Sequence, residues 1–486
     1  MILATLPGLS SVRAGNEDEK VDLKALLKRI EELEQKVRIL ESNKEPVVAT
    51  PDAKAQKRIE ELDQQVRILE RKRELDAEAA DAKFKEASQK PTSLFKSPDW
   101  VTSVRLVNDL RMRYDGIYAP DSDFVTRQRI RPRLRLGGIA TLQDDFEIGF
   151  RLASSPSVGK DSGGDPLSTN QTFEDNGSRK PVGIDWAFAR WTPIHTPEWT
   201  GSFALGKLEN PPNYTEDVFD VDYTPEGLAE QFSYKLNANH TVSAYLGQYM
   251  LDELQFSNSD PLLFLEQLRL DSKWSQHVNT AFTVSGLSIA NPENLTTANV
   301  PDSNHGNTRT VAGVLVNDYQ LLIADGSLTY NLDSFPLYNG PFPISLAGEY
   351  IHNFGASRDN SAYSLGVSFG RVSQRNAAGI RNQKGKWEIS YRYQELQGDA
   401  NYEELTAPDN GAFYRERPPG EPALTPFRST FLNGLNLRGH AFRLAYAPFD
   451  SLVFDARVWL NEPINVLSSA DKVQGVRFLF DAVWKF

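Results

Sequence analysis

Hydrophobic residues recur with two different periods along the chain, and the change falls near residue 99. Between about residues 20 and 90 they are spaced three and four residues apart, which is the heptad pattern of a coiled-coil helix. From Asp99 to Phe486, apolar and polar residues alternate, which places them on opposite faces of β-strands. The pattern predicts an N-terminal coiled coil at residues 20–90 and an all-β domain at residues 99–486.

The helical segment contains two copies of one sequence. The stretch KRIEELEQKVRILE at residues 28–41 recurs as KRIEELDQQVRILE at residues 57–70, an offset of 29 residues. Pro46 and Pro51 lie between the copies and predict a break, because proline lacks an amide hydrogen and interrupts a helix. The predicted coiled-coil seam consists of Leu23, Leu26, Ile30, Leu33, Val37, Leu40, Ile59, Leu62, Val66 and Leu69.

The number of helices in this coil is open from the residues alone. Each seam covers about three heptads or fewer, which is marginal for an isolated coil, so we expect other contacts to support oligomerisation. Ile or Val at position a with Leu at d favours two helices, whereas the stretch RIEELE resembles a pattern associated with three. We favour three, and a solvated pair of single helices is the alternative.

Sixteen segments of the second region alternate with period two. They lie at residues 102–113, 125–142, 145–154, 183–193, 198–207, 226–236, 240–250, 262–274, 277–289, 322–332, 342–353, 361–371, 386–396, 437–448, 451–461 and 473–486. The number is even and short connections alternate with long ones, as in single-chain outer-membrane barrels. No window approaches 18 consecutive apolar residues. The predicted fold class is an all-β transmembrane barrel of about 16 antiparallel strands, preceded by the α-helical coiled coil.

One predicted strand carries five arginines in line. In RQRIRPRLRLGG, residues 127–138, arginine occupies every second position from Arg127 to Arg135, so a strand places all five on one face. Turning them toward lipid would cost about 2–4 kcal/mol for each arginine near the midplane. The arginines are therefore predicted to line the barrel interior. With neighbouring strands in the same phase, the predicted basic wall is Arg105, Arg111, Arg113, Arg127, Arg129, Arg131, Arg133, Arg135 and Arg151.

A basic wall needs water, counter-ions or carboxylates, because unpaired buried charge is unfavourable. The predicted source of carboxylates is the long loop from Asn210 to Gly227. Its acidic residues are Glu216, Asp217, Asp220 and Asp222. If this loop folds inward, the acids face the arginines across a constriction that selects solutes by size and charge. The alternative is that the loop stays outside and its acids face external water.

Composition restricts the chemistry of the chain. Its 53 Lys and Arg against 65 Asp and Glu give a net charge of -12, which argues against nucleic acid as a partner. Cysteine is absent, so disulfides, thiolate metal ligands and cysteine nucleophiles are excluded. The six histidines are dispersed without metal-ligand spacing. We therefore predict no enzymatic activity, no metal and no cofactor.

Both ends have features of an exported protein. Residues 1–15 contain a short apolar run and a cleavage-like sequence but no basic leading segment, so they are interpreted as the remnant of a secretory signal whose true start lies upstream. A disordered native tail is the alternative. The last strand has an aromatic face that includes Trp484 and Phe486. A terminal strand ending in phenylalanine resembles the signal read by the barrel-assembly machinery of Gram-negative bacteria.

Several motifs within residues 99–236 resemble the "putative porin" family of Gram-negative outer membranes, in which a signal peptide and a coiled coil precede a barrel. They include DLRMRYDGIY, RQRIRPRLRLGG, FEIGFRLASS, DPLSTNQTF and SRKPVGIDWAF. The resemblance implies a homotrimeric passive-diffusion channel for small hydrophilic solutes and ions, surrounded by outer-membrane lipid, with the arginine-rich strands in its wall. Trp186 departs from the pattern, because a polar residue is expected after Asp185, and suggests that this strand meets lipid or another subunit.

Two other functions fit the same pattern. A periplasmic coiled coil would serve as a structural tether between the outer membrane and the cell wall if it bound peptidoglycan. A barrel-fold outer-membrane hydrolase is also compatible, because a fold does not determine a function. The hydrolase would require a serine, a histidine and an acid to converge at one rim of the barrel.

Overall fold

The computed structural model describes Gln64, Arg71 and residues 98–118, 126–155, 164–301, 306–372, 383–415, 429–465 and 472–486. The chain divides into two compact units, Met1–Lys96 and Ser97–Phe486. The predicted signal remnant and all ten predicted seam residues, from Leu23 to Leu69, lie outside the described residues. Within the described part of the chain, no helix is long and apolar enough to cross a membrane.

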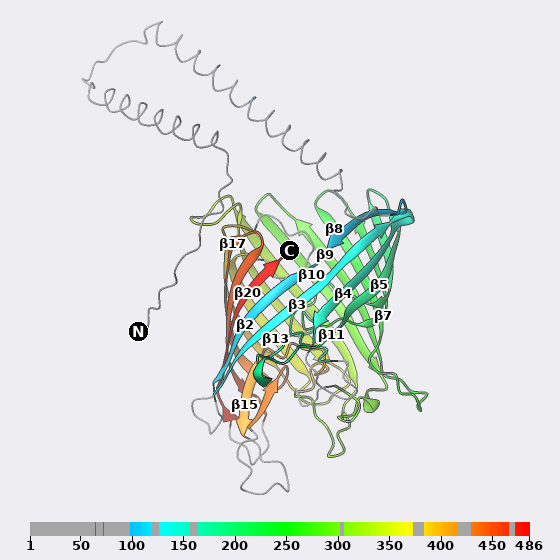
Figure 1. Cartoon of the computed structure of the whole chain (residues 1–486), viewed down its shortest axis with the longest axis vertical. Helices are drawn as coiled ribbons and strands as arrows, with labels where there is room; N and C mark the ends of the chain where they lie inside the picture. Colours follow the sequence, from blue (N-terminus) through cyan, green and yellow to red (C-terminus); the bar gives the residue numbers. More distant parts are fainter. Residues whose placement is uncertain are drawn as a thin grey trace, which may run out of the picture. The chain divides into compact units, whose positions relative to one another are not determined.

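The second unit is built of β-strands (Figure 1). Their bounds are β1 (Val101–Leu106), β2 (Asp109–Tyr118), β3 (Arg127–Leu142), β4 (Phe146–Ser154), β5 (Val182–His195), β6 (Trp199–Lys207), β7 (Glu226–Lys235), β8 (His240–Met250), β9 (Leu262–Lys273), β10 (Val278–Ala290), β11 (Tyr319–Leu332), β12 (Phe342–Asn353), β13 (Ser361–Gly370), β14 (Lys386–Leu396), β15 (Gly411–Arg415), β16 (Ser429–Asn433), β17 (Leu437–Phe449), β18 (Leu452–Pro463), β19 (Lys472–Val473) and β20 (Gly475–Lys485). Seventeen of them form one sheet of antiparallel neighbours, and β2 pairs with β20 to close it into a barrel.

These seventeen strands occupy sixteen positions in the barrel wall, because β1 and β2 share one. β1 pairs with the second half of β3 and β2 with its first half, in one continuous register. The interruption lies at Asn108, whose side-chain oxygen accepts a hydrogen bond of 2.9 Å from the amide of Gly137. A Cβ at Gly137 would lie 2.3 Å from the carbonyl oxygen of Phe150, so only glycine fits this close approach. The predicted barrel of sixteen antiparallel strands is confirmed.

Period-two alternation located all sixteen wall strands, including those between residues 290 and 341. The predicted bounds of β8, β12 and β14 agree with the structure at both ends. Short turns join the strands at one end of the barrel and long loops at the other, as the connection lengths predicted. The β13–β14 connection, residues 371–385, is the long exception on the turn side.

The long-loop end carries a second, smaller sheet. β15 pairs with β16 and with β19, so the β14–β17 and β18–β20 connections are joined by backbone hydrogen bonds. The sequence pattern did not predict this sheet.

Side chains alternate between the two faces of the wall in the predicted phase. On β3, Ile130 is 52% exposed on the outer face, whereas Arg133 and Arg135 are buried on the inner face. The exposed outer residues around the barrel are mainly leucine, isoleucine, valine and aromatic residues. Such a surface suits a hydrocarbon environment, and the charged side chains are turned inward.

Candidate functional site: the interior ion-pair network

The inner faces of β2 and β3 place some charged residues opposite an opposite charge and others opposite a like charge. The strand register places Asp109 opposite Arg135, Arg111 opposite Arg133, and Asp115 opposite Arg129. Directly opposite residues share one face of a sheet and lie within side-chain reach. Asp109 bridges two arginines, at 2.8 Å from Nη2 of Arg133 and 2.7 Å from Nε of Arg135. The wall therefore supplies part of its own neutralising charge.

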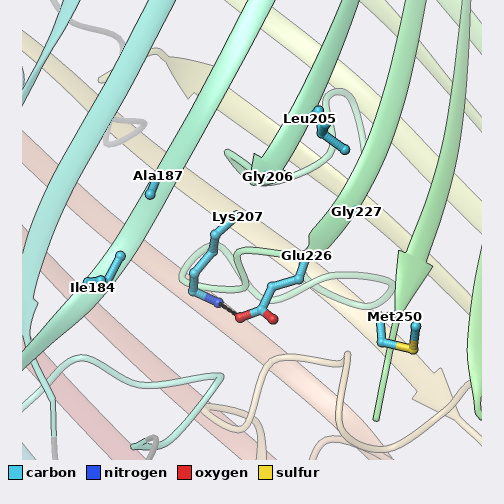
Figure 2. Close-up of a pocket in the computed structure, with 8 residues that line it drawn as sticks. All are labelled: Ile184, Ala187, Leu205, Gly206, Lys207, Glu226, Gly227 and Met250. Atoms are coloured by element: carbon cyan, nitrogen blue, oxygen red, sulfur yellow. Dashed lines mark hydrogen bonds and ion pairs between the residues drawn. The ribbon is translucent and has the colours of Figure 1, made fainter. Parts of the chain in front are cut away.

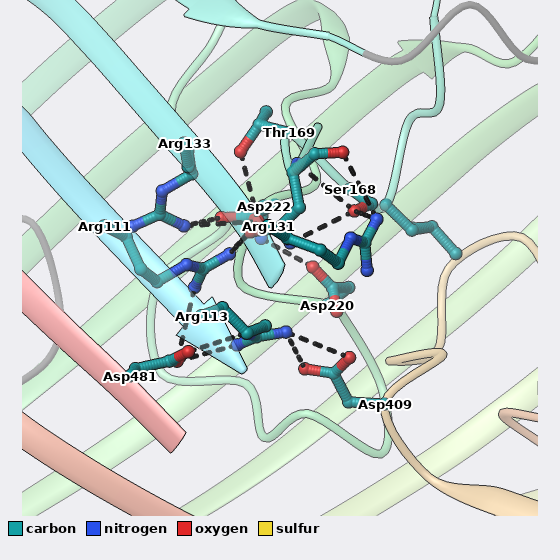
Figure 3. Close-up of polar contacts among 12 residues, drawn as sticks. Arg111, Arg113, Arg131, Arg133, Ser168, Thr169, Asp220, Asp222, Asp409 and Asp481 are labelled. Carbon is teal, nitrogen blue, oxygen red and sulfur yellow. Dashed lines mark hydrogen bonds and ion pairs between the residues drawn. The ribbon is translucent and has the colours of Figure 1, made fainter. Parts of the chain in front are cut away.

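The loop between β6 and β7, residues 208–225, supplies a second carboxylate to the same arginines. We call it the interior loop. Asp222 lies 3.1 Å from Arg133 and 3.0 Å from Arg135, and Arg111 lies 3.8 Å away (Figure 3). The hydroxyl of Thr169 also approaches Asp222, at 3.4 Å. One aspartate of the loop thus contacts three arginines of the wall.

The interior loop crosses the inside of the barrel. Besides β2 and β3, it contacts inward side chains of four other strands. Glu216 pairs with Arg457 of β18 at 3.0 Å, and Asp217 pairs with Arg392 of β14 at 3.2 Å. The hydroxyl of Thr215 donates to Glu349 of β12 at 2.7 Å, and Gln267 of β9 donates to the carbonyl oxygen of Pro212. These strands are spread around the circumference, so the loop reaches all of them only by lying across the interior.

Asp220 and Asp222 are two residues apart in the interior loop but have opposite electrostatic environments. Burial alone would raise the pKa of Asp222, but Arg133 and Arg135 outweigh burial and hold that pKa well below its usual range. Burial raises the pKa of Asp220 well above its usual range, and the charge of Asp222 raises it further. The Asp220 carboxyl instead accepts a 2.7 Å hydrogen bond from the amide of Asp222. Asp222 is therefore held in its charged form, whereas the surroundings of Asp220 favour its neutral form.

A second loop, residues 397–410 after β14, packs on the interior loop and adds another acid. The amide of Asp220 donates to the carbonyl oxygen of Leu405 at 2.7 Å, and Asn401 donates to that of Val218 at 3.0 Å. Asp409 of this second loop pairs with Arg113 at 3.1 Å and with Arg477 at 3.2 Å. The sequence predicted this segment only as a long external loop.

The terminal strand β20 completes the network. Asp481 pairs with Arg113 at 2.7 Å, and Arg477 pairs with Asp115 at 3.2 Å. The residues that meet here are inward side chains of β2, β3 and β20 plus one acid from each of the two loops. Among the described residues, this core contains Arg111, Arg113, Arg129, Arg131, Arg133, Arg135, Arg477, Asp109, Asp115, Asp222, Asp409 and Asp481.

Seven arginines therefore meet five aspartates, so the arginines of the predicted basic wall lie beside carboxylates of the kind that such a wall was expected to need. Arg135 is 1% exposed and is paired on both sides. Water cannot stabilise charges at this burial, so each guanidinium needs a carboxylate or another acceptor. This core of the interior is a nearly neutral ion-pair network with two more arginines than aspartates.

A third segment supplies neutral acceptors to the arginines. The side-chain oxygen of Asn170 accepts a 2.6 Å hydrogen bond from Arg111, and the main-chain oxygen of Asn170 accepts one of 3.2 Å from Arg131. Gln171 and Phe173 donate backbone hydrogen bonds to Pro132 and Ile130, along the part of β3 that β4 does not cover. The stretch DPLSTNQTF had been singled out in the sequence without a structural role.

Three of the predicted interior arginines lie outside the core of the network. Arg105 and Arg127 are exposed near opposite ends of the paired strands β1 and β3. Arg151 pairs with Asp185 and lies over the ring of Trp186, 3.7 Å from its centroid. Trp186 is 3% exposed, so the expectation that it meets lipid or another subunit is wrong. A register shift between β4 and β5 turns Asp185 and Trp186 inward together.

Several network residues were absent from the predicted site. Arg457 and Arg477 occupy inward positions of strands that the sequence did identify, and so does Asp481. Their signal was the phase of the alternation, which the sequence analysis applied to the arginine-rich strand and its neighbours along the chain but not to the last strands. Asp409 had no such signal, because it lies in a loop without periodicity. Among the described residues, no group of three His, Asp or Glu side chains is arranged to hold a metal ion.

A shallow hollow on the outer surface is separate from this network (Figure 2). Its lining includes Ile184, Leu205 and Met250, all of which are exposed outer-face residues. Lys207 and Glu226 form an ion pair of 3.0 Å across it, at the ends of β6 and β7. The hollow lies where β6 ends and β7 begins.

The fold is a closed antiparallel β-barrel, and comparisons with known proteins indicate which family of barrels it is similar to. Residues 124–285, a third of the chain, match the family model described as "Putative porin". This segment runs from the arginine-rich β3 to β10 and supports a porin family for the barrel. No curated protein matches the chain.

Similar solved structures include three outer-membrane barrels. OprB of Pseudomonas putida at high pH has a TM-score of 0.46 and 10% sequence identity, covering 80% of this chain and 95% of that one. A loop L8 deletion mutant of OmpT, an outer membrane protein of Vibrio cholerae, has a TM-score of 0.39 and 9% identity, with coverages of 79% and 99%. OccK8 (OprE) of Pseudomonas aeruginosa has a TM-score of 0.38 and 9% identity, with coverages of 80% and 100%.

Proposed function

We propose that the chain is an outer-membrane porin through which small hydrophilic solutes and ions diffuse passively. The observation that carries this proposal is the closed barrel with an apolar outer face and an inward ion-pair network that a loop crosses. Charged side chains in the interior suit a water-containing path, and the interior loop narrows that path. We infer a channel rather than an enzyme. The core of the network has two more arginines than aspartates, which favours weak anion selectivity.

Single-channel recording of the purified protein in a planar bilayer tests this proposal. We expect discrete conductance steps and a reversal potential in a KCl gradient that is shifted slightly toward anions. Steps that occur in threes would support the proposed homotrimer. Strong cation selectivity would contradict the excess of arginine in the path. Correctly folded, heat-modifiable protein without any channel steps would refute the porin function and favour the tether or the hydrolase.

The pH dependence of conductance provides a second prediction, which concerns Asp220. The pKa of Asp220 is raised in the folded loop, so its protonated form stabilises the inward position of the interior loop. This stabilisation is largest below the ordinary aspartate pKa of about 3.9 and declines as the pH rises. Between the pKa of Asp220 in the unfolded chain and its pKa in the folded loop, each pH unit reduces the free energy that holds the loop inward by about 1.4 kcal/mol. Conductance is therefore expected to increase as the pH rises above about 4. Asp220→Asn, which cannot ionise, should remove this slope, and an unchanged slope in the variant would contradict the assignment.

The segment before the barrel is proposed to be a periplasmic coiled coil that contacts peptidoglycan. Deletion of residues 16–90 is expected to leave single-channel conductance unchanged and to reduce co-sedimentation of the protein with cell-wall sacculi. This expectation follows because the interior network lies entirely within the second unit. Equal co-sedimentation of the deleted and complete proteins would argue against the tether.

We further propose that Trp484 and Phe486 at the end of the closing strand form the signal for the barrel-assembly machinery.

A further inference from the structure

Two carboxylates lie on the otherwise apolar outer face of the barrel. Glu266 of β9 lies between Leu265 and Gln267, which are both buried on the inner side, so its own side chain is on the outer face. Glu230 of β7 is directly opposite Phe203 and Leu246, which are exposed outer residues. In the described wall strands, every other outward Asp, Glu, Lys or Arg lies within two residues of a strand end.

Both carboxylates lie in the middle part of the wall. Directly opposite residues define a row that runs from Trp191 through Phe203, Glu230, Leu246, Glu266, Gly286 and Leu322 to His352. Trp191 is near the turn end of β5, and His352 is near the loop end of β12. The row therefore climbs across the wall, as expected for tilted strands. Glu230 and Glu266 occupy its middle, where a bilayer is hydrocarbon.

The carboxylate at the rim and the carboxylates in the middle differ in their partners. At the end of β7, Glu226 is paired with Lys207 at 3.0 Å (Figure 2). Four residues deeper on the same strand, Glu230 forms no hydrogen bond or ion pair with any described residue, and neither does Glu266. Hydrocarbon offers no hydrogen-bond donors, so intramembrane carboxylates generally face protein or water.

The same surface contains a donor and a flat backbone region. Gln248 of β8 is exposed on the outer face, directly between Leu228 and Phe264. The outer positions of the strands beyond Glu266 include Gly286 and Gly326, and a Cβ at Gly286 would lie 3.0 Å from Oε2 of Glu266. Small residues allow two membrane proteins to approach closely. Acceptors, a donor and a flat surface are thus combined on one face.

We propose that this face, formed by Glu230, Gln248, Glu266 and Gly286, is an interface with a second copy of the same chain. Gln248 lies about 6.6 Å from Leu246 along β8, and Glu266 lies about 4.8 Å from Leu246 across to the neighbouring strand β9. With a strand tilt of about 45°, Gln248 and Glu266 both lie closer than Leu246 to the loop end of the barrel. Their heights along the barrel axis differ by about 1 Å. The amide and the carboxylate are at the same depth, so a neighbouring copy in the same membrane supplies a donor for the carboxylate.

This proposal rests on the proposed outer-membrane location, and cross-linking tests it. Because the chain has no cysteine, Leu246→Cys can be labelled with a benzophenone maleimide at a single position. The matched control is Leu444→Cys, which is 55% exposed on the outer face of β17. Irradiation of native outer membranes is expected to give a product of two chains from position 246 and none from position 444. Lipid adducts alone, a product with a different protein, or equal products from both positions would overturn the proposal.

The stability of the assembly gives an independent readout. Glu230→Leu/Glu266→Leu is expected to dissociate the oligomer at a lower temperature on semi-native gels, while each barrel stays heat-modifiable. The Glu230→Gln/Glu266→Gln pair should retain the oligomer, because an amide still hydrogen-bonds. A more stable oligomer with leucine would overturn the proposal. If position 246 gives no product while the same protein conducts in bilayers, the interface is refuted but the porin function stands. Absence of channels would refute the porin function itself.

Discussion

Replacing Asp222 with asparagine is expected to shift the reversal potential toward anions and to raise single-channel conductance. Asp222 is the loop carboxylate closest to Arg133 and Arg135, and it also lies 3.8 Å from Arg111. Removing its charge increases the excess of arginine in the path. It also removes the ionic attachment between the interior loop and β3. Loss of one partner from a buried ion pair costs about 3–5 kcal/mol, which weakens the attachment of this part of the loop to β3.

Asp220→Asn provides the matched control at neutral pH. The substitution makes the same chemical change two residues away in the same loop, but the pKa of Asp220 is already raised well above its usual range. The substitution therefore removes less negative charge than Asp222→Asn does, and the shift of selectivity should be smaller. Glu216 and Asp217 still hold the loop to Arg457 and Arg392 in both variants. Equal shifts of reversal potential in the two variants would show that Asp222 has no special electrostatic role.

The wall was predictable from the sequence because each side chain of a wall strand faces either the hydrocarbon or the barrel interior. Arg131, Arg133 and Arg135 cannot face hydrocarbon, and this excluded the other phase of β3 without any knowledge of its neighbours. A single register shift is enough to interrupt this alternation of inward and outward positions. The register shift beside Arg151 turns Asp185 and Trp186 to the same side, so a strict count of alternate positions placed Trp186 on the wrong face.

The partners of the arginines were harder to predict than their direction. The sequence identified the loop acid Asp222 as a candidate, but it did not assign Asp409 or Asn170 to the arginines. These residues lie in loops, whose paths depend on packing against other loops rather than on a repeating pattern. The backbone contact between Asp220 and Leu405 is an example, since the residues are far apart in sequence and neither loop has a period. Strand periodicity predicted the wall, and tertiary packing decided how its charges are neutralised.

Replacing Arg135 with methionine is expected to reduce the free energy of unfolding by about 3 kcal/mol and to lower the yield of folded barrel. Arg135 is 1% exposed and contacts Asp109 and Asp222, so its removal leaves two buried carboxylates with fewer partners. Heat-modifiable gel shifts and urea titration of the folded protein measure the loss. Arg127→Met is the control, because Arg127 has the same inward phase on β3 but is exposed and makes no ion pair with any described residue. The control should unfold at the same urea concentration as the unsubstituted protein.

A double-mutant cycle separates the ion pair from simple packing. Asp109 is directly opposite Arg135 in the β2–β3 register, and the pair does not depend on the interior loop. Asp109→Asn and Arg135→Met should each destabilise the barrel, but the double variant should be more stable than the sum of the two effects by about 1–3 kcal/mol. The reason is that the second substitution removes a charge that has already lost one of its two partners. Additive losses would mean that the contact between Asp109 and Arg135 does not itself stabilise the wall.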